Sequence, residues 1–191
     1  MDHTPGTDQE RRFRRLYETH YAAVLAYARR RTLDADDAQE VVAEVFTVAW
    51  RRLADVPEGD DALPWLYGVG RRVLANQWRG NRRRTDLWTR LTGQHADEVE
   101  IESDVLSVDD RRLVLEALGR LKEADQEILR LTTWEELPHR QVAGILGCAE
   151  ATVAVRLHRA RNRLGREIEK GAAREGQKGS KGPEHRAEGQ P

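Results

Sequence analysis

Apolar residues recur at steps of three and four along most of this 191-residue chain, and this spacing limits its possible folds more than any other feature. Such steps place side chains on one face of an α-helix, whereas a half-buried strand needs strict alternation. No window of the sequence sustains alternation. Only 39% of the residues are hydrophobic, and 34% are charged. The pattern therefore predicts an all-α protein whose helices each bury one face around small cores.

The periodicity, and its loss, divide the chain into two small helical domains. Residues 1–10 are polar, and we expect them to be disordered. Residues 11–84 carry three helical patterns and predict an N-terminal helical bundle. Residues 85–109 lose the pattern and predict a flexible acidic linker. Residues 110–170 predict a C-terminal four-helix domain, and the glycine-rich residues 171–191 predict a disordered tail.

The stretch LPHRQVAGILGCAEATVAVRLHRARNRL, Leu137 to Leu164, is the most specific local pattern. A short apolar helix is predicted to end at Gly147, because a left-handed glycine commonly terminates a helix. A longer helix is expected from Glu150, and its inward stripe is Val153, Leu157, Ala160 and Leu164. Two helices joined by a short turn that contains glycine predict a helix-turn-helix.

The second helix of such a motif lies in the major groove of DNA and presents its first exposed residues to the bases. Arginines on its flanks would neutralise phosphates, and Arg156 or Arg159 is able to form a bidentate contact with guanine worth about 1–3 kcal/mol. The alternative is an ordinary helical hairpin with a solvated basic face; the one-sided arginines and the glycine position favour DNA. The residues expected to contact the duplex are Thr152, Val155, Arg156, His158, Arg159, Arg161 and Arg163.

The formal net charge of −1 conceals a separation of signs along the chain. Arginines cluster at residues 71–84 and 156–166, and acids cluster at residues 34–44 and 97–110. Separated signs indicate that different faces meet different partners, and basic faces suit phosphate. Either cluster alone is also compatible with a solvated helix face.

Several classes of protein are not supported by the sequence. No segment approaches about 18 uninterrupted apolar residues, so no membrane insertion is expected. The N-terminus is polar and acidic, unlike a signal peptide, which predicts a cytoplasmic protein. We find no Cys/His cluster with metal spacing, no phosphate-binding glycine loop and no Ser-His-Asp candidate. The expectation is therefore a protein without catalytic residues, metal or cofactor.

Four stretches in this order resemble the extracytoplasmic-function (ECF) sigma factors, the small specificity subunits of bacterial RNA polymerase. They cover almost everything from Arg11 to Glu167. The resemblance implies sigma region 2 at residues 11–84 and sigma region 4 at residues 110–170. The stretches are FRRLYETHYAAVLAYARRR, DADDAQEVVAEVFTVAWRRL, PWLYGVGRRVLANQWRGNRRR and LVLEALGRLKEADQEILRLTTWEELPHRQVAGILGCAEATVAVRLHRARNRL.

The resemblance also implies partners and the residues that meet them. The partners are core RNA polymerase, through its β′ clamp helices and its β subunit, promoter DNA and an anti-sigma factor; the free chain is expected to be a monomer. The second helix resembles the family's polymerase-docking surface, with Asp37, Glu40, Glu44 and Trp50 at its acidic and aromatic positions. The loop Val56 to Leu63 and the helix after it resemble the element for the promoter's minus-ten region. The residues expected to capture melted DNA there are Trp65, Arg71, Arg72, Asn76, Arg79, Arg82 and Arg83.

The final helix pair resembles the domain that recognises the minus-thirty-five element. This chain has Ala154 and Val155 where the family usually has Lys or Arg followed by Ser. Polar contacts with bases are therefore in question at these two positions, although Val155 could pack on a thymine methyl group.

The implied function is to bind core polymerase, to recognise both promoter elements and to promote melting, while the polymerase makes the bonds. A stand-alone helix-turn-helix regulator is an alternative, and it predicts a dimer and a symmetric operator. A helical adaptor whose basic faces bind an acidic protein is another, and it predicts no salt-dependent affinity for DNA. An acidic second helix beside a basic third helix in one small domain favours the sigma factor.

Overall fold

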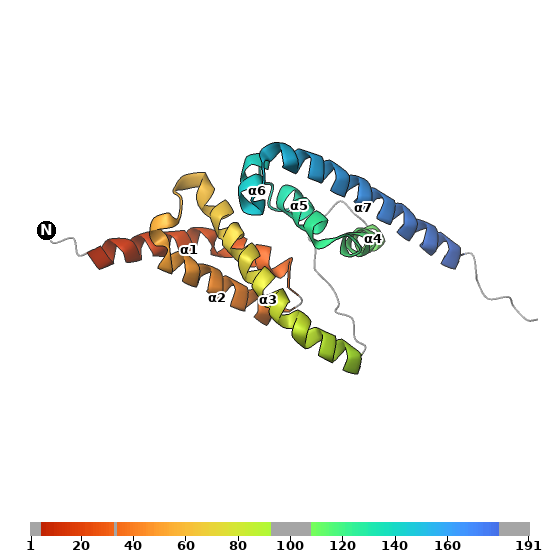
Figure 1. The fold of residues 1–191 in the computed structure, drawn as a ribbon, viewed down its shortest axis with the longest axis horizontal. Coiled ribbons are helices and arrows are strands. Elements are labelled where there is room, and N and C mark those ends of the chain that lie inside the picture. The colour runs from red at the N-terminus through yellow and green to blue at the C-terminus, as the bar shows by residue number, and fades with distance from the viewer. Residues whose placement is uncertain (1–4, 33, 93–107, 180–191) are drawn as a thin grey trace, which may run out of the picture. The chain divides into compact units, whose positions relative to one another are not determined.

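The structure of the chain is a computed structural model. It describes residues 5–32, 34–92 and 108–179, and within them the side chains of residues 8–32, 34–77 and 110–174. Over these ranges the chain forms helices and turns and no strand, which confirms the predicted all-α class (Figure 1). None of the described helices combines the length and the apolar character that a membrane span requires.

Three helices make up the first half of the structure. They are α1 (Pro5–Arg29), α2 (Ala35–Arg51) and α3 (Ala62–Thr92), and each contacts the other two (Figure 1). Two short 3-10 helices, η1 (Leu53–Asp55) and η2 (Gly59–Asp61), connect α2 to α3. The bundle agrees with the one predicted from apolar spacing. Its largest fully buried side chains are Val24, Tyr27, Val41, Val45, Leu66 and Leu74.

Acidic residues stabilise the start of α2. Asp34 has an extended backbone, and its carboxylate accepts a hydrogen bond from the Asp37 amide at 2.7 Å. This cap satisfies one of the amides that lack a partner in the first turn. Asp36 and Asp37 add negative charge where the helix dipole favours it. Partial burial, together with the charges of Asp34 and Asp36, raises the pKa of the Asp37 carboxyl.

Several helices are longer than the apolar spacing predicts. The first helix begins at Pro5 instead of Arg11, where proline suits a first turn and Asp8 pairs with Arg11 at 3.5 Å. α3 continues to Thr92, and the last helix continues to Gly179. A solvated helix needs no apolar stripe, so spacing alone underestimates its length. The rest of the predicted disordered ends and linker, residues 1–4, 93–107 and 180–191, lies outside the described residues.

Four helices make up the second half: α4 (Val108–Gly119), α5 (Glu123–Thr133), α6 (His139–Leu146) and α7 (Glu150–Gly179). Gly147 ends α6 with φ 64° and ψ 42°, the left-handed conformation expected from the sequence. The Cys148 amide then donates to the Ala143 carbonyl at 3.1 Å. Within the predicted stripe of α7, Val153, Leu157 and Ala160 are buried and Leu164 is half-buried.

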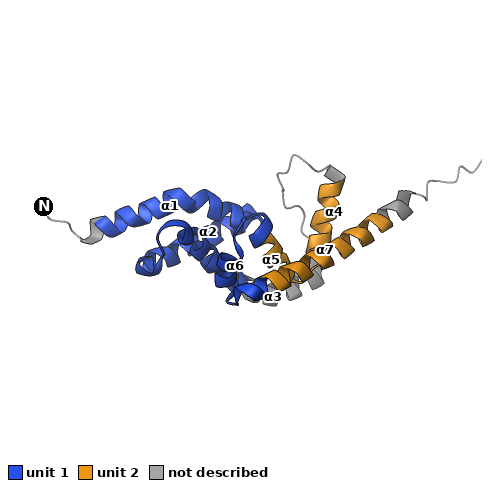
Figure 2. Cartoon of the chain, turned by 90° about the horizontal axis from the view of Figure 1, so that it is seen from above, with its two compact units in different colours: residues 1–100, 131–153 blue, residues 101–130, 154–191 orange. Residues whose placement is uncertain are grey.

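Two compact units divide the chain differently from the predicted domains (Figure 2). One contains α1, α2 and α3 together with Leu131–Val153, a segment that includes α6. The other contains α4, α5 up to Arg130, and α7 from Ala154. Periodicity finds helices but not their long-range partners, so it cannot reveal that α6 packs on α3.

Tyr27 lies at the centre of the contact between α1 and α3. Its ring is fully buried and stacks on Tyr67, with the ring centres 4.7 Å apart and an interplanar angle of 17°. The Arg31 guanidinium covers the ring at 3.6 Å from its centre, a cation–π distance. A Cβ at Gly70 would lie 3.0 Å from the Tyr27 Cε1 atom and 3.5 Å from a Val45 methyl group. The absence of a side chain at position 70 therefore lets the two helices approach.

Gly70→Ala is expected to lower the free energy of unfolding by about 1–3 kcal/mol, because the buried Tyr27 ring has no room to move. Gly68→Ala is the matched control in the same helix. A Cβ there meets nothing within 4 Å, so the substitution should stabilise the chain by about 0.5–1 kcal/mol through helix propensity. Urea titration followed by circular dichroism measures both. Equal effects of the two substitutions would contradict this account of the contact.

Candidate functional site

The outward face of α2 carries the acids predicted to bind a partner. Val41, Val45 and Ala49 are buried on the inner side, whereas Glu40 and Glu44 are exposed. Asp37, at the edge of the same side, is half-buried. With three helices in the bundle, α2 buries only one side, so its acids are open to solvent. The structure therefore brings three of the four predicted docking residues onto one side of one helix.

Trp50 lies on a different part of the α2 surface. At about 100° per residue, it is rotated by about 80° from Glu40. Its side chain is 40% exposed, and it packs edge-on against Phe13 of α1 with ring centres 5.1 Å apart. The predicted grouping of Trp50 with the acids thus corresponds to one curved surface and not to a single stripe.

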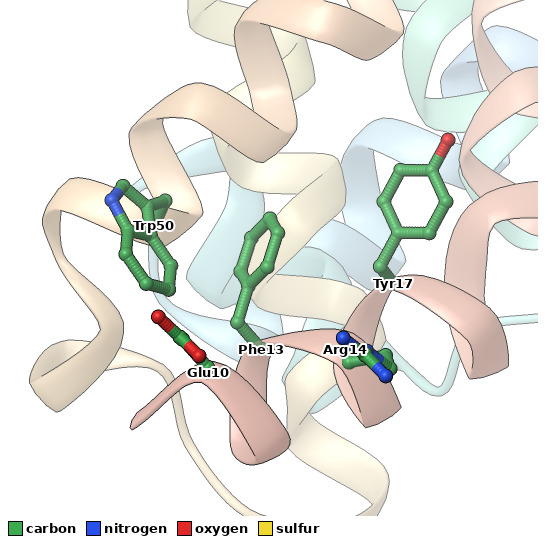
Figure 3. Close-up of a pocket in the computed structure, with 5 residues that line it drawn as sticks. All are labelled: Glu10, Phe13, Arg14, Tyr17 and Trp50. Carbon is green, nitrogen blue, oxygen red and sulfur yellow. The ribbon is translucent and has the colours of Figure 1, made fainter. Parts of the chain in front are cut away.

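An open pocket of about 450 Å³ lies beside Trp50 (Figure 3). Glu10, Phe13, Arg14 and Tyr17 of α1 line it together with Trp50. Phe13 stands between Trp50 and Tyr17, and Tyr17 is 39% exposed (Figure 3). Phe13 and Tyr17 are not among the site residues predicted from the sequence. Half-exposed aromatic rings are typical anchors of protein interfaces, so α1 adds an apolar edge to the acidic face.

The exposed side of α3 carries the first part of the predicted single-strand site. Trp65 is half-buried, and Arg71, Arg72 and Asn76 are exposed. Arg72 and Asn76 follow Trp65 by seven and eleven residues, which places the three on one side of the helix. Arg71 lies on a neighbouring strip. Arg79, Arg82 and Arg83 belong to α3, but their side chains lie outside the described residues.

The residues predicted to meet duplex DNA form the outer surface of α7. Thr152 is half-buried, and the other six are exposed, with Val155 at 51%. His158 lies within hydrogen-bond distance of the Asn162 amide, with 3.0 Å between the nitrogens. An exposed valine near the start of a recognition helix offers a methyl surface and no hydrogen bond. The geometry is compatible with packing on a thymine methyl group.

Arg163 differs from the other arginines of α7. Its Nη1 atom donates to both oxygens of Asp125 in α5, at 2.9 and 2.6 Å. The Asp125 carboxylate is buried, whereas the Arg163 side chain is half exposed. A phosphate would therefore compete with Asp125 for this guanidinium. Charge and spacing in the sequence give no sign of this pair.

Arg163→Ala is expected to lower the free energy of unfolding by about 1–2 kcal/mol, because it leaves the Asp125 charge buried without its partner. Arg159→Ala removes an equally charged, exposed side chain from the same helix and should change stability by less than about 0.5 kcal/mol. Chemical denaturation of both variants provides the comparison. If Arg159→Ala is the more destabilising, the pair with Asp125 does not support the fold.

Comparison with known families gives two matches along the chain. The model of Sigma-70 region 2 matches residues 16–84, and the model of Sigma-70, region 4 matches residues 111–164. The first match contains α2 and most of α3, and the second contains the helix-turn-helix. The surfaces of α2, α3 and α7 described above therefore include residues of these two regions, whereas Glu10, Phe13 and Arg14 of the pocket precede the first match.

Individual relatives extend the match across the chain. The ECF RNA polymerase sigma factor SigL of Mycobacterium tuberculosis is 34% identical over 151 residues, which cover 76% of this chain and 82% of SigL. The RNA polymerase sigma factor CnrH of Cupriavidus metallidurans is 28% identical over 167 residues, which cover 83% of this chain and 87% of CnrH.

A solved structure supports the same assignment. The sigma factor RpoE from Bartonella quintana, determined in complex with the anti-sigma factor NepR, matches with a TM-score of 0.64 and 25% sequence identity. The match covers 82% of this chain and 96% of RpoE. With helices, helix-turn-helix and both sigma regions in place, this chain belongs to the extracytoplasmic-function family of RNA polymerase sigma factors.

Proposed function

We propose that this ECF sigma factor binds core RNA polymerase through the outward face of α2 and promoter DNA through α3 and α7. The observation that carries the proposal is the opposition of charges within one small bundle. Glu40 and Glu44 are exposed on α2, and Arg71 and Arg72 are exposed on α3. Oppositely charged faces on adjacent helices suit a protein that joins a polymerase to nucleic acid, and neither competing hypothesis explains both.

On the polymerase side, the acids provide charge and the aromatic edge provides apolar area. Glu40, Glu44 and Asp37 would meet basic residues of the β′ clamp helices. Trp50, with Phe13 beside it, would bury an apolar side chain of the same partner. An interface of this kind combines a desolvated aromatic anchor with charges that guide association.

Toward DNA, α3 and α7 would each supply a different kind of contact. Trp65, Arg72 and Asn76 would hold melted single strand by stacking and by charge. Arg156 and Arg159 would hold the duplex, and Val155 would contribute an apolar contact to a thymine. Arg163 remains a proposed phosphate contact that competes with Asp125. Arg79, Arg82 and Arg83 would continue the cationic track along α3. The chain positions DNA, and the polymerase forms the phosphodiester bonds.

An anti-sigma factor is a further proposed partner. RpoE of Bartonella quintana was solved with the anti-sigma factor NepR, and CnrH was solved with the cytosolic domain of CnrY. An anti-sigma factor of this chain would cover the outward face of α2 and the aromatic edge, which would prevent polymerase docking. We place the chain in the cytoplasm, where polymerase and promoters are found.

Glu40→Lys is expected to weaken assembly with core polymerase by about tenfold, because a repulsive charge replaces an attractive one on the docking face. Glu18→Lys makes the same charge change on the exposed side of α1 and should leave assembly near the wild-type value. Titration of labelled chain with core polymerase measures both dissociation constants. Wild-type affinity in the Glu40→Lys variant would refute the docking assignment for this face.

Arg156→Ala and Arg159→Ala should each weaken binding of the holoenzyme to a promoter duplex. A lost phosphate contact lowers the slope of log affinity against log salt concentration by about 1, whereas a lost guanine contact relaxes sequence preference at one position and costs about 1–3 kcal/mol. Arg166→Ala, an exposed arginine farther along α7, is the control. Run-off transcription over a promoter library, repeated at several salt concentrations, separates the outcomes. The assignment fails if all three variants behave alike.

A further inference from the structure

Glu135, in the connection between α5 and α6, is a buried acid that the proposed function does not use. Its side chain is only 1% exposed. One oxygen accepts a hydrogen bond from Arg31 Nη1 at 2.8 Å, and the other accepts one from Arg30 Nη2. Both arginines directly follow α1, more than a hundred residues earlier in the chain and within the same compact unit.

The site that receives Glu135 is built from α1 and α3. The Arg31 side chain is also 1% exposed; it lies over the Tyr27 ring and donates to the Tyr27 carbonyl at 3.1 Å. Burial, and next the negative charge of Glu135, raise the pKa of the neighbouring Tyr67 to about 12. The carboxylate thus lies in a recess lined by cationic and aromatic side chains.

A second, exposed set of contacts lies where α6 begins. Arg140 Nη2 donates to Asp61 Oδ2 at 3.4 Å. The side-chain amide nitrogen of Gln141, Nε2, donates to Asp61 Oδ1 at 3.1 Å and to the Asp60 backbone carbonyl at 3.3 Å. Asp60 and Asp61 belong to η2, inside the loop Val56 to Leu63 proposed to hold the minus-ten region. The first helix of the helix-turn-helix therefore contacts the loop that a melted strand would have to enter.

The two sets of contacts differ in strength. Arg140 is 75% exposed, so its pair with Asp61 is weak and is screened by salt. The Glu135 pair is enclosed, and its geometry is specific. Its net contribution is nevertheless limited, because both charges regain water when they separate. Such a pair selects one arrangement of α6 without making it irreversible.

We propose that Glu135, Arg30 and Arg31 form a clasp that holds α6 on the minus-ten loop in the free chain and that opens when the chain binds core polymerase. The proposal rests on the proposed function, together with the family resemblance that assigns this loop to the minus-ten region. A closed clasp lowers the apparent affinity of the free chain for DNA, because only the open molecules bind. The apparent association constant is the intrinsic one multiplied by the open fraction. The holoenzyme, in which polymerase binding offsets closure, escapes this reduction.

The test uses the full chain with Glu135→Gln, which keeps the size of the side chain and removes its charge. Glu136→Gln is the matched control, because Glu136 is the adjacent acid and its side chain is exposed. Binding is measured with a fluorescent single-stranded oligonucleotide of mixed sequence, and amide hydrogen exchange is followed in η2 and α6. Glu135→Gln should bind the strand about tenfold more tightly than Glu136→Gln and should exchange faster in both segments.

A second variant keeps the test decisive if Glu135→Gln does not fold. Arg140→Gln removes an exposed cation, so simple electrostatics predicts weaker binding to DNA. The clasp predicts slightly tighter binding, because a weak contact that helps hold α6 on the loop is lost. The clasp is overturned if Arg140→Gln binds more weakly than wild type and Glu135→Gln, where it folds, binds no more tightly than its control.

Run-off transcription by the holoenzyme distinguishes the clasp from the proposed function. Glu135→Gln should transcribe as the wild type does, because docking has already opened the clasp. A loss of transcription in this folded variant alone would show that Glu135 acts in the holoenzyme and would overturn the proposal. If the wild-type chain gives no polymerase-dependent transcription, the proposed function fails, while hydrogen exchange still reports whether the clasp exists.

Discussion

The surfaces of this sigma factor follow from one constraint: three helices can bury only one side of each helix. Val41, Val45 and Ala49 of α2 face inward, and this fixes Glu40 and Glu44 on the outside. The same core turns Arg71, Arg72 and Asn76 of α3 toward solvent. The acidic and basic faces are therefore consequences of the packing, and no separate device is needed to orient them. Within the second half, the stripe of Val153, Leu157 and Ala160 orients the arginines of α7 in the same way.

Polar contacts add information that apolar packing lacks. Apolar side chains of similar size can often replace one another at a small cost in stability. A buried carboxylate, in contrast, needs hydrogen-bond donors at specific positions around it. Glu135 meets that condition between Arg30 and Arg31, and Asp125 meets it at Arg163. Both acids join segments that are distant in the sequence. Arg163 is also a proposed phosphate contact, so the fold and the functional surface share this cation.

Local features were predictable from the sequence, and long-range pairs were not. The left-handed turn at Gly147, the cap at Asp34 and the inward stripe of α7 each depend on residues within a few positions of one another. The pairing of Glu135 with Arg30 and Arg31 depends on choosing among 33 acids and 32 lysines and arginines, and no local rule makes that choice. Helix ends were underestimated because apolar spacing marks only the turns that carry an apolar stripe. The family resemblance grouped Trp50 with the acids. Only its contact with Phe13 shows that Trp50 belongs to an aromatic surface shared with α1.

The close approach of Gly70 to Tyr27 also bears on how such a chain can diverge over generations. A residue larger than glycine at position 70 meets the Tyr27 ring, and that ring is held by Tyr67 below it and by Arg31 above it. The two positions are thus coupled, although they lie far apart in the gene. A larger residue at position 70 costs less stability once a smaller side chain has replaced Tyr27, so the geometry of one aromatic stack favours one order of substitutions over the other.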